Sequence, residues 1–319
     1  MSQPLAVNGK GISRIKLFLA LSRTPHGLLD MATPLFCALL WLGGFPSLEV
    51  GLLGLLTVFS GYTAVYALND VIDYRFDKDK MMQDRESAAS EGYLDSLLVR
   101  HPLAQSRLSY LEAVLWTLGW GLLAMLGAYL LNPWCMFIFL GAGLLEIGYC
   151  LLWNVSPSRS IVSGGVKTSG PVAAVLAVDP HPSALFLLLL FLLFFCWEVG
   201  GQNIPADWTD METDRRFGAQ TIPVRFGPAP AGKLALGALG LSLLLSPAVF
   251  LASGLAPSIP LLGLVLAIGV WQLLLPGWRL KVHQGRDQAM ALFNRASSYP
   301  LSLLGAVLLA ILLQRFGLA

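Results

Sequence analysis

Asn69-Asp70-Val71-Ile72-Asp73-Tyr74-Arg75-Phe76-Asp77 follows an apolar run that extends from about Leu48 to Leu68. The stretch has the pattern NDxxDxxxD. If the helix of the apolar run continues through it, Asn69, Asp73 and Asp77 are four residues apart and share one helix face. Carboxylates placed this closely repel one another unless a cation lies among them. The stretch therefore predicts a cation site at the end of an apolar helix.

A second acidic stretch follows the apolar run from Pro182 to Ile204 and has the pattern DxxDxxxD. The matched aspartates are Asp70 with Asp207, Asp73 with Asp210 and Asp77 with Asp214, each 137 positions apart (207 − 70, 210 − 73 and 214 − 77). The alternative is that each stretch is only a solvated helix end. Because only 13% of the residues are charged, two matched clusters favour one shared cavity that holds divalent cations around a diphosphate.

The composition is typical of a polytopic membrane protein. Of the 319 residues 55% are hydrophobic and 13% are charged, compared with about 25% charged in soluble domains. The mean hydropathy is +0.67, and apolar runs long enough to span a bilayer recur along the chain. The lipid bilayer is therefore an expected partner, and no nucleic acid is expected. The four cysteines lie in apolar segments without a CxxC pair, which indicates packing roles.

Nine apolar segments are expected to span the membrane, so the fold is predicted to be all-α. They cover about 25–44, 48–68, 108–131, 134–153, 168–178, 183–204, 233–253, 259–278 and 299–313. Ile161 is an alternative start for the fifth. A basic lead, residues 1–24, precedes them, and two polar segments, 71–107 and 205–232, carry the motifs. Residues 1–319 are expected to form one transmembrane domain. The spacing of the motifs suggests two four-helix pseudo-repeats plus one helix around a central cavity.

The distribution of basic residues predicts the orientation. With nine spans, every one of the 21 lysines and arginines except Arg315 falls on one side. By the positive-inside rule that side is the cytoplasm. The N-terminus and both motifs are then cytoplasmic and the C-terminus lies outside, in a bacterial-type inner or cell membrane.

Oxygen ligands in this arrangement suit Mg²⁺, which combines carboxylates, waters and phosphate oxygens. Two facing clusters could hold ions that neutralise a departing diphosphate. Basic residues beside the motifs are candidates to bind the remaining phosphate charge: Lys78, Lys80, Arg215 and Arg216. The alternative for each of them is topological anchoring alone.

The chain resembles the UbiA superfamily of intramembrane prenyltransferases over nearly its whole length. Besides the two motifs and nine spans, three segments are similar to the superfamily: Ser22-Arg23-Thr24-Pro25, Phe217-Gly218-Ala219-Gln220-Thr221-Ile222-Pro223-Val224-Arg225-Phe226-Gly227, and Leu292-Phe293-Asn294-Arg295-Ala296-Ser297-Ser298-Tyr299. The resemblance implies Mg²⁺-dependent transfer of a prenyl group from a prenyl diphosphate to a lipophilic acceptor, often an aromatic ring, in quinone or lipid biosynthesis.

The resemblance also implies the residues of the site. Metal ligands would be Asn69, Asp73, Asp77, Asp210 and Asp214, supported by Asp70 and Asp207. Of these, Asp73, Asp77, Asp210 and Asp214 would be catalytic. Arg23 and Lys167 would contact the diphosphate. The allylic diphosphate would ionise, the acceptor would attack the cation, and a proton would be lost.

Two departures from the superfamily leave questions open. Tyr149 is not followed by the usual lysine, and the nearest basic residues are Arg159 and Lys167. The segment from 78 to 100 is longer than usual, so the acceptor stays undefined. Among the acids inside spans, which are functional candidates, Glu198 is a candidate to face the cavity. The competing class of function is a transporter or carrier that binds a cation or a phosphorylated lipid through the same acids.

Overall fold

The computed structural model describes residues 13–83, 98–99 and 101–316, with the side chains of 80–83 left out of the description. All regular structure in these residues is helical. The elements are α1 (Arg14–Leu21), α2 (Thr24–Asp30), α3 (Ala32–Leu42), α4 (Leu48–Ile72), α5 (Tyr74–Gln83), α6 (Tyr110–Leu131), α7 (Pro133–Leu151), α8 (Arg159–Val178), α9 (Ala184–Trp197), the π-helix η2 (Glu198–Asn203), α10 (Ile204–Thr209), α11 (Met211–Arg216), α12 (Ile222–Phe226), α13 (Pro228–Leu251), α14 (Ile259–Gly269), the π-helix η3 (Val270–Leu274), α15 (Leu275–His283) and α16 (Arg286–Arg315).

Nine helical segments within the described residues are long and apolar enough to cross a bilayer, which confirms the predicted fold class. Three of them are composite: α2 with α3, α9 with η2 and α10, and α14 with η3 and α15. The fifth and ninth begin earlier than the main prediction, at Arg159 and Arg286. The alternative start of the fifth at Ile161 is close to the observed one.

Side chains that face a cavity explain the error at the fifth span. The first half of α8 contains Ser160, Ser163, Gly164 and Lys167, which lower its hydropathy. Ser163 and Lys167 line the central cavity and therefore need no apolar neighbours in lipid. A hydropathy criterion assumes contact with lipid on all sides, so it places the start of this helix too late.

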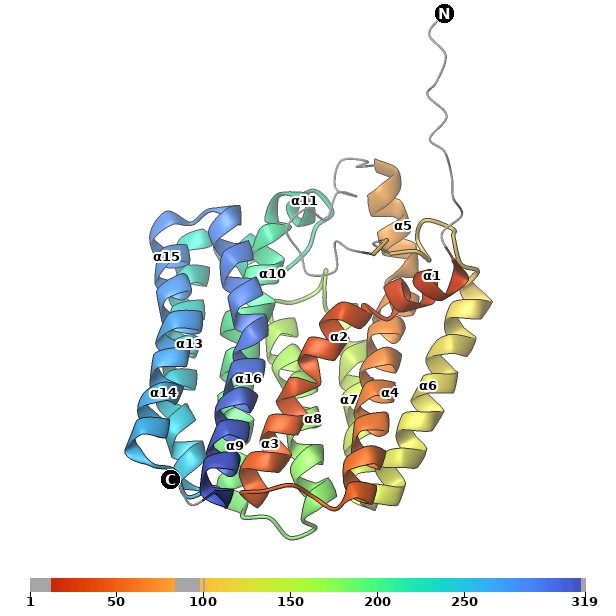
Figure 1. Ribbon diagram of the computed structural model, residues 1–319. Helices are drawn as coiled ribbons and strands as arrows, with labels where there is room; N and C mark the ends of the chain where they lie inside the picture. The colour runs from red at the N-terminus through yellow and green to blue at the C-terminus, as the bar shows by residue number, and fades with distance from the viewer. Residues whose placement is uncertain (1–12, 84–97, 100, 317–319) are drawn as a thin grey trace, which may run out of the picture.

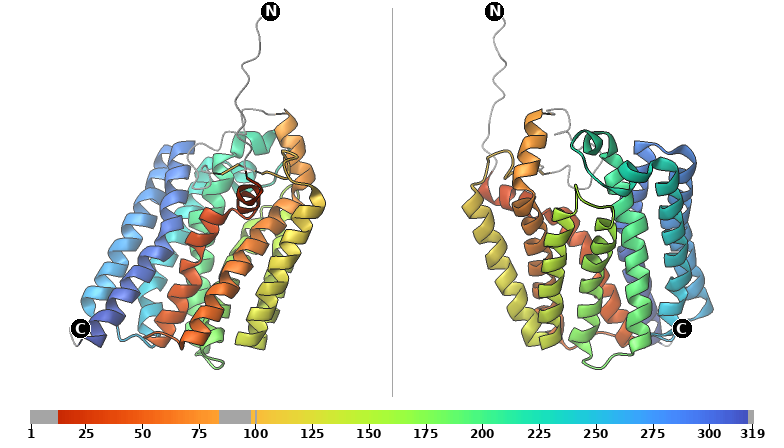
Figure 2. Two further views of the ribbon diagram at one scale, coloured as in Figure 1. Left: turned by 45° about the vertical axis from the view of Figure 1, so that its right-hand side comes forward. Right: turned by 180° about the vertical axis from the view of Figure 1, so that it is seen from behind.

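The spans run side by side along one direction, and both motifs emerge at the same end (Figure 1). At that end α5 follows the first motif and α10 and α11 carry the second. Figure 2 shows from two further sides that α16 finishes at the opposite end. The first four spans lie on one side of the molecule and the sixth to eighth on the other, with α8 packed against both α3 and α7.

The second half of the chain carries most of the apolar core. Fully buried side chains from α9, α13 and α16 form its centre, with Phe194, Phe250 and Tyr299 among the largest. Helices α4, α6 and α7 are less buried, although α4 and α6 pack along each other. Lipid-facing leucines cover their outer surface, and the central cavity lies on their inner side.

Two adjacent glycines allow η2 to pack closely on its neighbours. A Cβ atom at Gly200 would lie 2.7 Å from the carbonyl oxygen of Ala235, and one at Gly201 would lie 2.8 Å from the Cβ atom of Ala296. A Cβ atom at Gly164 on α8 would lie 2.5 Å from a ring carbon of Phe195. Gly164, Gly200 and Gly201 therefore allow close packing between helices.

We expect cysteines introduced at His283 and His181 to be labelled from opposite sides of the membrane. His283 ends α15 at the motif end, whereas His181 lies in the α8–α9 turn at the other end, and both are exposed. The four native cysteines are buried, so a thiol reagent that does not cross membranes reports the new ones. Labelling of both from the same side of intact cells would contradict the nine-span orientation.

Candidate active site

A cavity of about 680 Å³ lies between the two halves of the chain. The residues of both motifs that line it are Asn69, Asp70, Asp73, Asp77, Asp207, Asp210 and Asp214. The structure therefore brings together all seven residues that the sequence proposed as one cluster.

The first motif spans a break between two helices. Helix α4 ends at Ile72 and α5 begins at Tyr74, while backbone hydrogen bonds from Asp73 to Asn69 (2.9 Å) and from Asp77 to Asp73 (2.8 Å) continue the helical path. The spacing of four residues is thus preserved, and the predicted shared face is maintained across the break.

Arg23 joins the N-terminal segment to the first motif. Its guanidinium donates hydrogen bonds to the side-chain oxygens of Asn69 (3.1 Å) and Asp70 (3.0 Å). Arg23 has φ of 44° at the junction of α1 and α2, a conformation that is uncommon for a residue other than glycine. This strained junction directs the guanidinium of Arg23 into the cavity. Backbone strain of this kind is frequent at functional sites.

His101 is a functional candidate that the sequence prediction missed. Its Nδ1 atom lies 2.9 Å from Asp77 and 3.4 Å from Asp70. Burial alone would lower the pKa of His101, but the carboxylates of Asp77 and Asp70 outweigh burial and raise it to about 9. In the sequence, His101 directly precedes Pro102 at the end of the long segment that follows the first motif.

Asp73 lies between neighbours of the same charge. Burial and the nearby carboxylate of Asp77 raise its pKa to about 7, against the opposing influence of Arg159 and Arg23. A cation placed between the carboxylates would relieve this repulsion.

Arg159 holds the second motif. Its Nη1 atom donates to Asp207 at 3.2 Å, and its guanidinium stacks over the ring of Tyr149 at 4.1 Å. Arg159 is buried and lines the cavity. Of the two basic residues that the sequence left open after Tyr149, Arg159 is the one beside the second motif.

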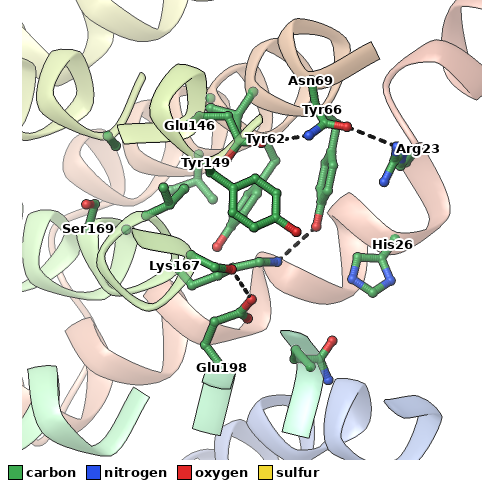
Figure 3. A pocket seen from close by; sticks show the side chains of 18 of the residues that line it. Arg23, His26, Tyr62, Tyr66, Asn69, Glu146, Tyr149, Lys167, Ser169 and Glu198 are labelled. Atoms are coloured by element: carbon green, nitrogen blue, oxygen red, sulfur yellow. Dashed lines mark hydrogen bonds between the residues drawn. The ribbon is translucent and has the colours of Figure 1, made fainter. Parts of the chain in front are cut away.

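Lys167 lies deeper in the same cavity and is paired with Asp30. Its ammonium donates to Asp30 and to the hydroxyl of Tyr66 (2.9 Å), and Tyr66 in turn donates to Asp30. Figure 3 shows Lys167 and Tyr66 meeting between α8 and α4, with Glu198 pointing toward Lys167 from below. Glu146 accepts from the amide of Asn69 at 2.9 Å, which links these side chains to the first motif.

Below these polar groups the cavity becomes apolar. Small side chains of α4 and α8 form much of its wall: Gly51, Gly54, Gly61, Gly170, Ala173, Ala174 and Ala177. From Asp73 to Gly51 helix α4 descends 22 residues, or about 33 Å at 1.5 Å per residue, which is close to the thickness of a bilayer's hydrocarbon core. The cavity therefore joins a charged end to a long apolar channel.

The donor set fits a divalent cation. Ligand atoms of Asp70, Asp77 and His101 lie within 4.8 Å of one another, and five further motif residues, four aspartates and Asn69, line the same cavity. The thiol of Cys150 lies beside Asn69, but oxygen donors predominate, which favours a hard cation. Carboxylate oxygens are ligands that Mg²⁺ prefers, one or two for each ion together with waters and phosphate oxygens.

The basic residues predicted to bind diphosphate occupy different positions. Arg23 lines the cavity, whereas Lys78, Arg215 and Arg216 are absent from the part of its wall that the structure describes. Arg215 and Arg216 are exposed, and Lys78 lies against Tyr74. Lys80 lies outside the described side chains. Geometry favours Arg23 and Arg159 for contact with a diphosphate.

Comparison with known proteins identifies relatives of this fold and sequence. Residues 31–299 match the model of the UbiA prenyltransferase family. The digeranylgeranylglyceryl phosphate synthase of Thermococcus sibiricus is 26% identical over 221 residues, which cover 69% of this chain and 72% of that protein. The synthase of the same name from Methanosarcina mazei is 28% identical over 209 residues, 66% of each chain.

Solved structures share the fold at lower identity. A UbiA homologue from Aeropyrum pernix K1 without ligand has a TM-score of 0.70 and 20% identity, covering 89% of this chain and 97% of that one. A UbiA homologue from Archaeoglobus fulgidus, bound to GPP and Mg²⁺, has a TM-score of 0.65 and 20% identity, covering 92% and 99%. These similarities establish the arrangement of the helices.

We expect Asp30→Asn and Lys167→Met to destabilise the protein singly and far less together. Each single variant leaves a buried charge without its partner, which costs about 3–5 kcal/mol, whereas the double variant removes both charges. Thermal unfolding of the purified protein measures the difference. The control Arg14→Ala breaks the exposed pair with Glu112 and should change stability by less than about 1 kcal/mol. Additive losses in the double variant would show that the pair is not coupled.

Proposed function

The chain belongs to the UbiA prenyltransferase family, and we propose that it transfers a prenyl group from an allylic prenyl diphosphate to a lipophilic acceptor within the membrane, releasing diphosphate. The observation that carries this proposal is the convergence of both aspartate motifs on one cavity whose opposite end is a long apolar channel. The charged end suits a diphosphate with its cations, and the channel suits a hydrocarbon chain.

Mg²⁺ is the proposed cofactor. Asp73, Asp77, Asp210 and Asp214 would hold it, with Asn69 beside them and Asp70 and Asp207 as supporting residues. When bound, Mg²⁺ neutralises the negative charge that develops on the diphosphate as the carbon–oxygen bond breaks. The Archaeoglobus fulgidus homologue bound to GPP and Mg²⁺ supports this choice.

Arg23 and Arg159 are the proposed protein contacts of the diphosphate. They approach the cavity from opposite motifs, Arg23 through Asn69 and Asp70 and Arg159 through Asp207. A guanidinium can form charge-assisted, bidentate hydrogen bonds to phosphate oxygens. Lys167, which the sequence also suggested, is paired with Asp30 about two turns below Arg159 on the same helix.

The rest of the cavity would bind and shield the prenyl chain. The wall of glycines and alanines on α4 and α8 leaves space for a chain to lie along these helices. Exclusion of water from this channel would favour attack by the acceptor over hydrolysis.

The acceptor is proposed to be a lipophilic molecule that enters from the bilayer. The name of the two curated relatives indicates a glyceryl phosphate lipid as the acceptor in those proteins, whereas the resemblance to the wider superfamily suggested an aromatic ring. Both classes belong in an acceptor panel. The reaction is proposed to take place at the cytoplasmic face, where the basic residues gather.

We expect Asp73→Asn and Asp210→Asn each to abolish turnover. Each substitution keeps the shape of the side chain and removes one charge of the proposed metal site, so folding should survive. The parent should gain thermal stability from Mg²⁺ with a non-hydrolysable prenyl thiodiphosphate, because a ligand that binds only the folded state stabilises it. Both variants should lose this gain. Activity near the parent's at limiting Mg²⁺ would contradict one shared metal site and favour a transporter.

We expect Arg159→Ala to weaken the apparent affinity for prenyl diphosphate by about 10- to 100-fold, since a hydrogen bond to a charged group contributes about 1.5–3 kcal/mol. Arg159→Lys should recover only part of it, because lysine lacks the bidentate geometry. Arg225→Ala is the matched control, since Arg225 lies after the same motif but is exposed and does not line the described cavity. Equal affinities in Arg159→Ala and the control would exclude Arg159 as a diphosphate contact.

A further inference from the structure

Glu198 is a buried acid in the cavity that the two motifs do not explain. It is the first residue of the π-helix η2, between α9 and α10, and only 4% of its surface is exposed. π-Helical segments inside longer helices are frequent at functional sites. Glu198, Gln202 and Asn203 of this short segment all line the cavity. The irregular segment therefore presents three polar side chains to a space within the membrane.

One oxygen of Glu198, a residue that lines the cavity, is buried without a donor. Its Oε1 atom accepts a hydrogen bond from the hydroxyl of Ser163 at 2.6 Å. Among the described residues, none donates to its buried Oε2 atom. Leaving a buried polar atom unsatisfied costs about 1–3 kcal/mol, more for a charged group, so such atoms need an explanation. A ligand with an O–H group would supply the missing donor.

The depth of Glu198 suits contact with the acceptor. Ser163, which holds its carboxylate, lies one turn after Arg159 on α8. At 1.5 Å per residue, that level is about 6 Å below the point where Arg159 meets Asp207. A diphosphate bound at the motifs would place its allylic carbon on the way from the motifs to the channel. The carboxylate of Glu198 therefore lies next to the region where the new bond would form.

Neighbouring charges leave the carboxylate of Glu198 able to accept a proton. Lys167 is the nearest cation in Figure 3, but its ammonium is engaged by Asp30 and Tyr66. Within the described part of the chain no basic side chain forms an ion pair with Glu198. Glu146, the other deep acid, accepts instead from the amide of Asn69. Among the described residues, Glu198 is thus a deep carboxylate with one buried oxygen that lacks a hydrogen-bond donor.

We propose that Glu198 binds a hydroxyl group of the acceptor through Oε2 and receives its proton during prenyl transfer. This inference rests on the proposed function. The bond between the allylic carbon and the diphosphate oxygen breaks, and its electron pair leaves with the diphosphate. A lone pair of the acceptor oxygen forms the new carbon–oxygen bond. The hydroxyl proton moves to Glu198, which becomes a neutral acid and later releases the proton to water at the motif end.

Two pairs of probes test the need for a hydroxyl group. The first is a glycerol monoether phosphate with one long alkyl chain and its O-methylated form, and the second is a long-chain alkylphenol and its methyl ether. Purified full-length protein with Mg²⁺ and prenyl diphosphate is assayed for product mass and diphosphate release. Only the free hydroxyl compounds should be prenylated or stabilise the protein. A parent that binds prenyl thiodiphosphate but responds to neither free hydroxyl overturns the assignment of a hydroxyl acceptor.

Glu198→Gln tests the proton transfer. The variant should lose transfer by about 100-fold or more, the usual contribution of a general base, and keep its stabilisation by Mg²⁺ with prenyl thiodiphosphate. The loss should be larger for the glycerol hydroxyl than for the phenol, because a phenol, with a pKa near 10, loses its proton more readily. A purely structural role would reduce both acceptors equally. Glu49→Gln, an exposed acid outside the cavity, should behave as the parent.

Three results would overturn the role of Glu198: transfer within about threefold of the parent's in Glu198→Gln, equal losses with both acceptors, or loss of prenyl thiodiphosphate binding together with transfer. The last would identify a structural residue. Failure of the proposed function gives a different result, since the parent itself would then gain no Mg²⁺-dependent stability from prenyl thiodiphosphate.

Discussion

Repulsion among six aspartates that face one cavity is the constraint on which the rest of the site depends. Carboxylates buried together at a membrane boundary are unfavourable unless cations compensate them. Three cationic side chains among the described residues pair with these aspartates: Arg23 and His101 beside the first motif, and Arg159 beside the second. Each of these cations comes from a different segment: Arg23 from the α1–α2 junction, His101 from the segment before α6, and Arg159 from the start of α8. Their pairing with the aspartates therefore holds three separate segments at the same end of the cavity. Even so, burial and the nearby carboxylate of Asp77 keep the pKa of Asp73 raised to about 7. The three cations therefore do not fully compensate Asp73, and a further cation would stabilise its charged form.

The features that could be predicted from sequence are those with a local period. Runs of apolar residues gave the nine spans, and the spacing of four residues placed the acids on one face. Partners distant in sequence could not be predicted, because nothing in the pattern relates Arg159 to Asp207 or His101 to Asp77. The early start of α8 was missed for a related reason: its polar residues face a cavity formed by other helices. Four of the predicted diphosphate contacts, Lys78, Lys80, Arg215 and Arg216, were chosen because they lie beside the motifs in sequence. Such proximity could not point to Arg159, which precedes Asp207 by 48 residues.

The two halves of the chain divide the structural tasks. The second half buries large side chains around Trp197 and Tyr299, and its glycine contacts at η2 allow little movement. The first half is less buried in α4, α6 and α7, and α4 together with α8 contributes glycine and alanine to the cavity wall. One motif thus lies on a tightly packed side and the other on a more loosely packed side. Movement of the looser side would allow a large hydrophobic substrate to enter while the core stays packed.

Polarity decreases along the cavity from the motif end, where the diphosphate is proposed to bind, to the apolar channel proposed for the prenyl chain. Charges at the motif end would hold the leaving group of the proposed reaction, hydrogen-bonding side chains from Glu146 to Glu198 occupy the middle, and alkyl side chains form the remainder. A carbocation is stabilised by nearby negative charge but destroyed by water, so it needs polar protein groups without bulk solvent. A middle zone whose hydrogen bonds are mostly satisfied internally meets both needs. Glu198 Oε2 and Asn203 Oδ1 are unsatisfied in this zone, and in the proposed mechanism a second substrate would supply the donor that Glu198 lacks.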